Sequence, residues 1–310
     1  MNRKILLLYL AVVLLGGLDL LCGGGGLGLA GGSVLLKLRL PRVLTAILAG
    51  GALALSGALM QAVFRNPLSD PHIMGVSAGA GLGAAIAVVA TAGGGLILHG
   101  LALSGAAFAG AALVSALILL LSRRISSPGT LLISGVMLGF VFSAVSSVLQ
   151  YTANEESLKM YYSWAAGSFE GSRYGEVAVM AAAILLGTVL SLGNRRGLDI
   201  ILFGEDYAAL SGADVKRIRL GAMAATCLMT GAVTAFCGPI GFVGIIAPHI
   251  VRRLLGTSAH GRIIPAVLPA GSAIALCADI LSRIWSIPLP VGSTMAFVGI
   301  PVILVILLRK

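Results

Sequence analysis

Residues 40–63 read LPRVLTAILAGGALALSGALMQAV, and no charged residue follows Arg42 within this stretch. A helix needs about 20 mostly apolar residues to cross the hydrocarbon core of a bilayer, which is roughly 30 Å thick. The stretch is long enough and apolar enough to meet that requirement, so it predicts a transmembrane helix.

The composition of the whole chain indicates many such helices. Of its 310 residues, 58% are hydrophobic and 10% are charged, and the mean hydropathy is +1.04. Soluble domains carry about 25% charged residues, so a water-soluble enzyme and a disordered chain are both excluded. We therefore expect an all-α, polytopic membrane protein in which residues 1–310 form one membrane domain.

Polar residues divide the chain into ten apolar segments, which fits about ten spans at roughly 30 residues each. The segments cover residues 5–22, 40–63, 72–92, 98–121, 130–151, 175–192, 218–237, 241–254, 264–284 and 293–308. The eighth is short and contains Pro248, so we expect it to span only part of the bilayer. The first resembles a signal peptide, but Asp19 and Leu21 do not suit a cleavage site, which favours a retained helix.

Lysine and arginine residues lie between the apolar segments. The formal net charge is +10, yet there is no basic stripe with interleaved aromatic residues, so no nucleic-acid partner is expected. The positive-inside rule instead places both termini in the cytoplasm, including the terminal pair Arg309 and Lys310. The basic residues left on the outer side are Lys37, Arg39, Arg42, Lys159, Arg173 and Arg283.

Several catalytic motifs are missing from the sequence. It contains no Gly-Lys dipeptide and therefore no Walker A phosphate loop, so this chain is not expected to hydrolyse ATP itself. The four cysteines form no CxxC pair, and no metal site is expected. His72 and His249 each follow a proline. They could bind a metal or haem, but capping of carbonyl groups freed at a helix break is the simpler role.

Acidic residues are scarce within the apolar segments, and the main ones are Asp19 and Asp279. A proton- or sodium-driven carrier normally keeps ionisable groups near the bilayer midplane. Both aspartates lie nearer the outer ends of their segments, which counts against ion coupling.

A weak internal repeat pairs Gly50 with Gly231, Gly57 with Gly238, Pro67 with Pro248 and Gly75 with Gly256. The half-repeats would cover residues 38–151 and 218–310, that is, segments two to five and seven to ten. Five spans separate their starts, so the halves would face opposite ways. An inverted repeat is a transporter architecture with its substrate path at the repeat interface.

The fifth segment carries small and polar residues at helical spacing. These residues are Gly139, Ser143, Ser146, Ser147 and Gln150. Small and hydroxyl residues on one face allow close packing of helices. The alternative is that they line a pathway for a large substrate.

Longer motifs carry a family resemblance. The first half contains Leu38-Arg39-Leu40-Pro41-Arg42, Arg65-Asn66-Pro67-Leu68 and Gly75-Val76-Ser77-Ala78-Gly79-Ala80. The second half contains Cys237-Gly238-Pro239-Ile240-Gly241-Phe242-Val243-Gly244, Ala247-Pro248-His249 and Pro290-Val291-Gly292. With these motifs the whole chain resembles the FecCD-type permeases of ABC importers for ferric siderophores, haem and vitamin B12.

The resemblance implies ten helices per permease and a homodimer with the substrate path along its two-fold axis. It also implies two ATP-binding-cassette subunits on the cytoplasmic side and a soluble or lipid-anchored substrate-binding protein outside. ATP and Mg²⁺ would be bound by the partner ATPase, and this chain would bind no cofactor. The location implied is the bacterial inner membrane.

Two groups of site residues follow from the resemblance. The outer arginines Arg39, Arg42 and Arg283 would dock acidic residues of the binding protein. The cytoplasmic segment 193–217 would couple to the ATPase through Gly204, Glu205, Ala208, Ala209 and Gly212, with the small Ala208 and Ala209 allowing close approach to the partner.

The sequence therefore predicts a non-enzymatic translocation subunit of an ATP-driven importer. We expect a ferric siderophore as the substrate because it is the commonest assignment in the family, and haem or vitamin B12 is the alternative. An ion-coupled secondary transporter and an intramembrane enzyme using His249 and Asp279 are the remaining hypotheses.

Overall fold

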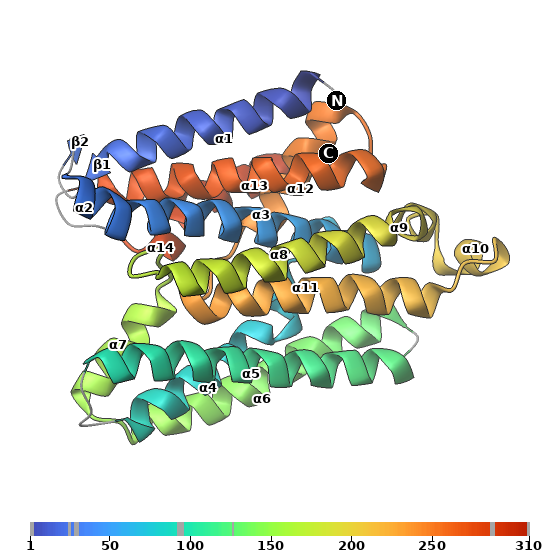
Figure 1. Ribbon diagram of the computed structural model, residues 1–310. Coiled ribbons are helices and arrows are strands. Elements are labelled where there is room, and N and C mark those ends of the chain that lie inside the picture. Colours follow the sequence, from blue (N-terminus) through green and yellow to red (C-terminus); the bar gives the residue numbers. More distant parts are fainter. Residues whose placement is uncertain are drawn as a thin grey trace.

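The computed structural model describes residues 3–23, 26–27, 31–91, 96–125, 127–285 and 289–308. It is a bundle of long helices with neighbouring axes side by side (Figure 1), and its one pair of described strands contains two residues each. The elements of the first half are α1 (Arg3–Leu21), β1 (Cys22–Gly23), β2 (Gly26–Leu27), α2 (Gly32–Val34), η1 (Leu35–Arg39), α3 (Leu40–Val63), η2 (Pro71–Met74), α4 (Val76–Ala90), α5 (Leu96–Arg124), α6 (Pro128–Tyr151) and α7 (Glu155–Ala165). Those of the second half are α8 (Tyr174–Gly193), α9 (Arg195–Ile201), α10 (Glu205–Leu210), α11 (Val215–Cys237), α12 (Val243–Leu255), α13 (His260–Arg283) and α14 (Val291–Leu308).

Each of the ten apolar segments contains one main helix, and the all-α fold is confirmed. Among the described residues, seven helical stretches are long and apolar enough to cross a membrane. The eighth segment forms the 13-residue α12, which at about 1.5 Å per residue is shorter than the bilayer core. The prediction of a partial span is therefore consistent with the length of α12.

The bundle has two ends, named here after the short helices that lie there. The α7 end also holds the β1–β2 pair, the start of α3 and the end of α13 (Figure 1). The α10 end holds α9, α10 and the first residues of α1, and Lys4 Nζ there donates to the Leu254 carbonyl at 2.6 Å. α14 starts at the α7 end, where the Val291 amide donates to the Gly167 carbonyl. Arg309 and Lys310 lie outside the described residues.

Local sequence signals explain where several helices begin. Pro128 occupies the first turn of α6, and Ser127 accepts a hydrogen bond from the Thr130 amide. Asp214 caps α11 in the same manner, by accepting from the Arg217 amide at 3.0 Å. Such caps satisfy amide groups that have no partner within the helix.

Glycines allow close approach between the helices of the core. A Cβ added at Gly50 would clash with the backbone of Gly271, so α3 and α13 touch at these positions. Gly57 of α3 contacts Gly244 of α12 in the same way, and Gly79 of α4 contacts the backbone of α5 at Gly110. These contacts are the small-residue packing that holds helices together in membranes.

The two halves contain helices in the same order of length, with a short second helix in each: α3, α4, α5, α6 and α11, α12, α13, α14. α3 runs from the α7 end to the α10 end, and α11 runs the other way (Figure 1). The two prolines that the predicted repeat pairs have different surroundings. Pro67 lies in the turn after α3, whereas Pro248 lies inside α12, so the two prolines do not mark equivalent breaks.

Candidate functional site

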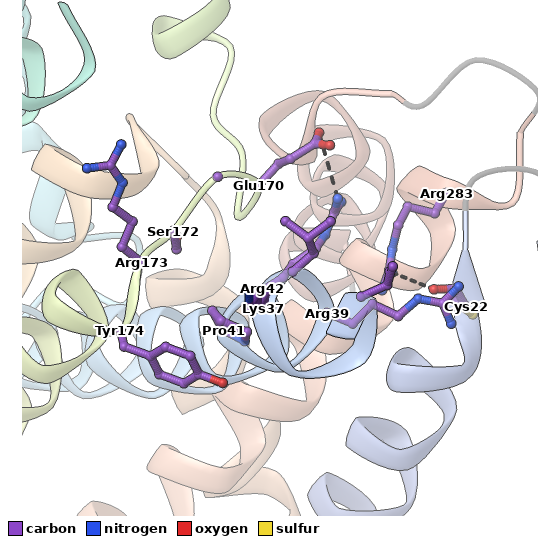
Figure 2. A pocket seen from close by; sticks show the side chains of 13 residues that line it. Cys22, Lys37, Arg39, Pro41, Arg42, Glu170, Ser172, Arg173, Tyr174 and Arg283 are labelled. Carbon is purple, nitrogen blue, oxygen red and sulfur yellow. Dashed lines mark hydrogen bonds and ion pairs between the residues drawn. The ribbon is translucent and has the colours of Figure 1, made fainter. Parts of the chain in front are cut away.

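A basic hollow of about 560 Å³ opens at the α7 end (Figure 2). Its lining comes from η1, the start of α3, the segment before α8 and the end of α13. The basic residues in this lining are Lys37, Arg39, Arg42, Arg173 and Arg283. Glu170 is the one acidic residue among the described lining residues. The hollow therefore has a positive charge that suits a carboxylate ligand.

A buried ion-pair network forms the floor of this hollow. Arg42 Nη2 lies 2.8 Å from Asp279 Oδ1, and Arg42 Nε lies 3.0 Å from Oδ2. Arg283 Nη2 lies 2.9 Å from Asp279 Oδ2 and forms a second ion pair with Asp19 of α1. Both aspartates are completely buried. Charges at such positions are stable only when paired, so the network ties α1, α3 and α13 together.

Arg39 and Cys22 lie at the edge of the network, beside the end of α1. Arg39 Nη1 donates to the Leu20 carbonyl at 2.9 Å and caps a terminal carbonyl of that helix. Burial raises the pKa of the Cys22 thiol, nearby Asp279 raises it further, and Arg39 opposes both. The thiol is therefore uncharged at neutral pH.

Glu170 occupies a different environment from the two buried aspartates. Its Oε2 lies 3.7 Å from Arg42 Nη1, and its side chain is 73% exposed. Figure 2 shows this carboxylate at the mouth of the hollow, joined to Arg42 by a dashed line. An exposed pair at this distance is weak, so another carboxylate can replace Glu170 there.

The structure brings the three predicted docking arginines together around one hollow but gives them different surroundings. Arg283 is 6% exposed and is already paired with two carboxylates, so it supports the floor. Lys37 and Arg173 are exposed at the rim. Their placement outside by the positive-inside rule was the sequence signal that could have identified them.

The predicted coupling segment forms α9 and α10, which project from the opposite end of the bundle (Figure 1). Gly204 joins the two helices with φ of 118°, a conformation that favours glycine. Three large apolar side chains are exposed around α10, Phe203, Tyr207 and Leu210, beside the exposed Asp206. The sequence interpretation overlooked these three residues.

The two alanines of α10 face opposite ways. Ala208 is completely buried, whereas Ala209 is exposed. The expectation that both allow close approach to a partner therefore needs correction. Ala208 packs α10 against the bundle, and only Ala209 lies on the outer surface. Gly212 follows α10 with φ of 78° and open space around it.

The polar residues of α6 point in more than one direction. Ser146 is buried, accepts a hydrogen bond from Gln150 at 3.0 Å and lies 3.4 Å from the Tyr161 hydroxyl. Gly139 packs beside Gly75 at the start of α4. Ser143 and Ser147 are exposed. Ser146, Gln150 and Gly139 thus support packing, and Ser143 and Ser147 lie on a free face of α6.

His72 has the capping role that the sequence favoured. Its Nε2 donates to the Ile240 carbonyl at 2.7 Å, in the break between α11 and α12. Nδ1 forms a hydrogen bond with the Ser77 hydroxyl. Within the described ranges, no group of three or more His, Cys, Asp or Glu side chains could hold a metal ion.

The bundle of long apolar helices defines a multi-pass membrane protein. A family model described as the FecCD transport family matches residues 8–309. The chain belongs to this family.

Individual relatives match over nearly the same length. The chain is 36% identical to the vitamin B12 import system permease protein BtuC of Klebsiella pneumoniae, covering 99% of this chain and 92% of the relative. It is 31% identical to the hemin transport system permease protein HmuU of Yersinia pestis, covering 89% and 83%. A solved structure described as a metal-chelate type ABC transporter in an inward-facing conformation superposes with a TM-score of 0.88 at 28% identity, covering 99% of both chains.

Proposed function

We propose that this chain is the membrane-spanning permease subunit of an ATP-driven ABC importer that moves a ferric siderophore from the outer face to the cytoplasm. The observation that carries the proposal is the separation of two surfaces along one bundle. A basic hollow lies at the α7 end, and exposed apolar side chains surround α10 at the other end. An importer of this class needs a different partner on each side of the membrane.

The basic hollow is proposed as the docking site for a substrate-binding protein. Arg42 at its centre and the rim residues Lys37 and Arg173 can receive acidic side chains of that partner. Arg173 can hold a carboxylate through two parallel hydrogen bonds, whereas Arg42 offers Nη1, because its Nε and Nη2 already hold Asp279. Arg39 and Arg283 keep the hollow in shape through their contacts with α1 and α13. Exposed charges of this kind accelerate and orient docking more than they strengthen it.

The α10 end is proposed as the contact with the ATPase subunits, which would bind ATP and Mg²⁺. Phe203 and Tyr207 lie with their ring centroids 5.8 Å apart, and Leu210 is 89% exposed. Large apolar side chains gathered at the tip of a short helix are typical of a segment that inserts into a partner. Burial of Ala208 keeps α10 attached to the bundle, so a push on the tip reaches the membrane helices.

The homodimer with a central path is proposed from the family and supported by α6. This helix packs on α4 and η2 and leaves one side free. The free side combines Ser143 and Ser147 with exposed apolar residues such as Phe140 and Val148. A second copy of the chain would cover the apolar part, and the two serines would face the path.

The identity of the substrate is the most specific part of the proposal. The relatives reported above are named for vitamin B12 and hemin, and the solved structure is described as a metal-chelate type transporter. All three names refer to metal complexes too large for a narrow channel. A ferric siderophore belongs to the same class, and haem or vitamin B12 is the alternative.

An ion-coupled carrier is the less favoured alternative. It would use titratable groups within the membrane, and the candidates from the sequence are Asp19 and Asp279. Both are paired with Arg283, and Asp279 is also paired with Arg42. Carboxylates that already hold two or three helices together through arginines have a structural role, and removing their charge would break a buried ion pair.

The proposed location is the bacterial inner membrane, with the α10 end in the cytoplasm. Most of the basic residues lie at this end, as the positive-inside rule requires of a cytoplasmic face. The N-terminal helix also begins there.

Reconstitution of the chain with its ATPase partner in liposomes tests the function. We expect uptake of an iron-loaded siderophore that requires ATP, the binding protein and an intact Walker A lysine in the ATPase. Hemin and cyanocobalamin, each with the same components, serve as the competing substrates. Uptake driven by a proton gradient without ATP would contradict the proposal.

A further inference from the structure

One arginine at the α10 end is buried although it lies near a helix terminus. Arg219 is in the second turn of α11, and its side chain is 2% exposed. Taking a guanidinium out of water is costly unless hydrogen bonds and charges compensate. Its partners therefore indicate what the residue does.

Partners of Arg219 lie at the ends of two other helices. Arg219 Nη2 donates to the Ile125 carbonyl at 2.8 Å and to the Ser122 carbonyl at 3.4 Å, both at the C-terminal end of α5. Carbonyl groups at this position have no partner within their own helix, and a cation there also interacts favourably with the helix dipole. On its other side, Arg219 Nη1 lies 3.6 Å from Glu205 Oε1.

Glu205 is the first residue of α10, the helix proposed to contact the ATPase. Its side chain is 24% exposed, so part of it faces solvent while its carboxylate reaches the buried guanidinium. Arg219 thus connects α10 to the end of α5. Because a guanidinium is planar and presents its donors in fixed directions, it can hold both partners at once.

The end of α5 matters because α6 begins at Pro128, shortly after it. α6 has few contacts with α5 along its length and packs on α4 and η2. The position of its first turn therefore depends on how the end of α5 is held. α6 also carries Ser143 and Ser147, the two residues proposed to face the path.

We propose that Arg219 is a positioning residue that transmits displacement of α10 to the junction of α5 and α6. The inference rests on the proposed function, since it assumes that an ATPase moves α10. It adds a defined route from that contact to the helix proposed to line the path: Glu205, Arg219 and the terminal carbonyl groups of α5.

The test uses the reconstituted complex with its ATPase and binding protein, and measures uptake and ATP hydrolysis on the same liposomes. Arg219→Met and Glu205→Gln should lower uptake per ATP by about tenfold while hydrolysis continues. Arg219→Lys should restore part of the coupling. Arg253→Met changes an exposed arginine in the last turn of α12, outside segment 193–217, and serves as the matched control. The double variant should be no worse than either single one, because both interrupt one route.

A conformational readout separates this role from a merely structural one. Single cysteines at Ser211 beside α10 and at Arg123 in the last turn of α5 are labelled with a maleimide, with the exposed Cys277 replaced by Ala. In the unaltered background, ATP should change the labelling rate at both positions. In Arg219→Met or Glu205→Gln, only the position beside α10 should respond.

Normal uptake per ATP in Glu205→Gln or Arg219→Met, or an ATP response at Arg123→Cys in either variant, would overturn the inference. These outcomes can be told apart from an error in the proposed function. If the proposed function were wrong, the unaltered complex would itself show no ATP-dependent uptake. Glu205→Gln is isosteric and partly exposed, so it keeps the test decisive if Arg219→Met does not assemble.

Discussion

Arg42 of α3 and Asp279 of α13 form a two-pronged ion pair between residues 237 positions apart in the chain. The aspartate is completely buried, and it is shared with Arg283 from its own helix. The pair therefore fixes the start of one central helix to the end of another at the floor of the basic hollow. The proposed docking partner would meet a prearranged surface there, and its carboxylate would take the place of Glu170.

This pair should be important for stability. Asp279→Asn would leave two arginines without their shared charge, and breaking a buried pair costs about 3–5 kcal/mol. Equilibrium unfolding in detergent should show this loss. Glu170→Gln removes an exposed partner of the same Arg42 and should change stability by only about 0–1 kcal/mol. Equal losses of unfolding free energy in Asp279→Asn and Glu170→Gln would contradict the distinction between a buried structural pair and an exposed, weak one.

Glu170→Gln should have its main effect on docking. Removing this carboxylate frees Arg42 for the acidic residue of the binding protein, so the Kd should fall by about two- to fivefold, as expected for a weak exposed pair. Titration of the binding protein onto the permease complex in nanodiscs, at low and high salt, measures this change. An increased Kd would mean that Glu170 helps docking and does not compete with it.

The exposed rim should supply the electrostatic part of docking. Lys37→Glu combined with Arg173→Glu should abolish stimulation of ATP hydrolysis by the loaded binding protein, while basal hydrolysis continues. Both side chains lie at the surface, so the fold should be unaffected. Lys159→Glu, on α7 outside this hollow, is the matched control. If the loaded binding protein still stimulated ATP hydrolysis in the double variant over a range of ionic strength, Lys37 and Arg173 would not belong to the docking site.

Ala208→Trp should uncouple ATP hydrolysis from uptake although the chain still inserts into the membrane. The added ring cannot fit beneath α10, because Ala208 is completely buried. It should therefore displace the helix from the bundle. Ala209→Trp, on the exposed side, should instead weaken association with the ATPase. The comparison requires uptake, hydrolysis and co-purification of the ATPase for each variant. Normal uptake by Ala208→Trp would show that α10 need not be attached to the bundle.

The membrane helices were predictable because the length and apolar character of a segment decide whether it spans a bilayer. The surroundings of individual charges were only partly predictable. Asp279 and Arg283 are four positions apart on α13, within reach of each other on one helix, but the other partner of Arg283, Asp19, comes from α1, 264 residues earlier. No local pattern reveals such a partner.

The orientation of short elements was also beyond the sequence. Ala208 and Ala209 are alike in size, and only packing against the bundle decides which one is buried. Arg219 looked like one more cytoplasmic basic residue. Its burial depends on the end of α5, nearly a hundred positions away in the chain.

ATP hydrolysis measured across a sealed membrane tests the central claim most directly. The complex is reconstituted in liposomes with the ATPase side inward and ATP enclosed, and the substrate-loaded binding protein is added outside. The account predicts that the added protein stimulates hydrolysis on the far side, and that stimulation is lost in the Lys37→Glu, Arg173→Glu variant. Hydrolysis that is indifferent to the binding protein in the unaltered complex would contradict it.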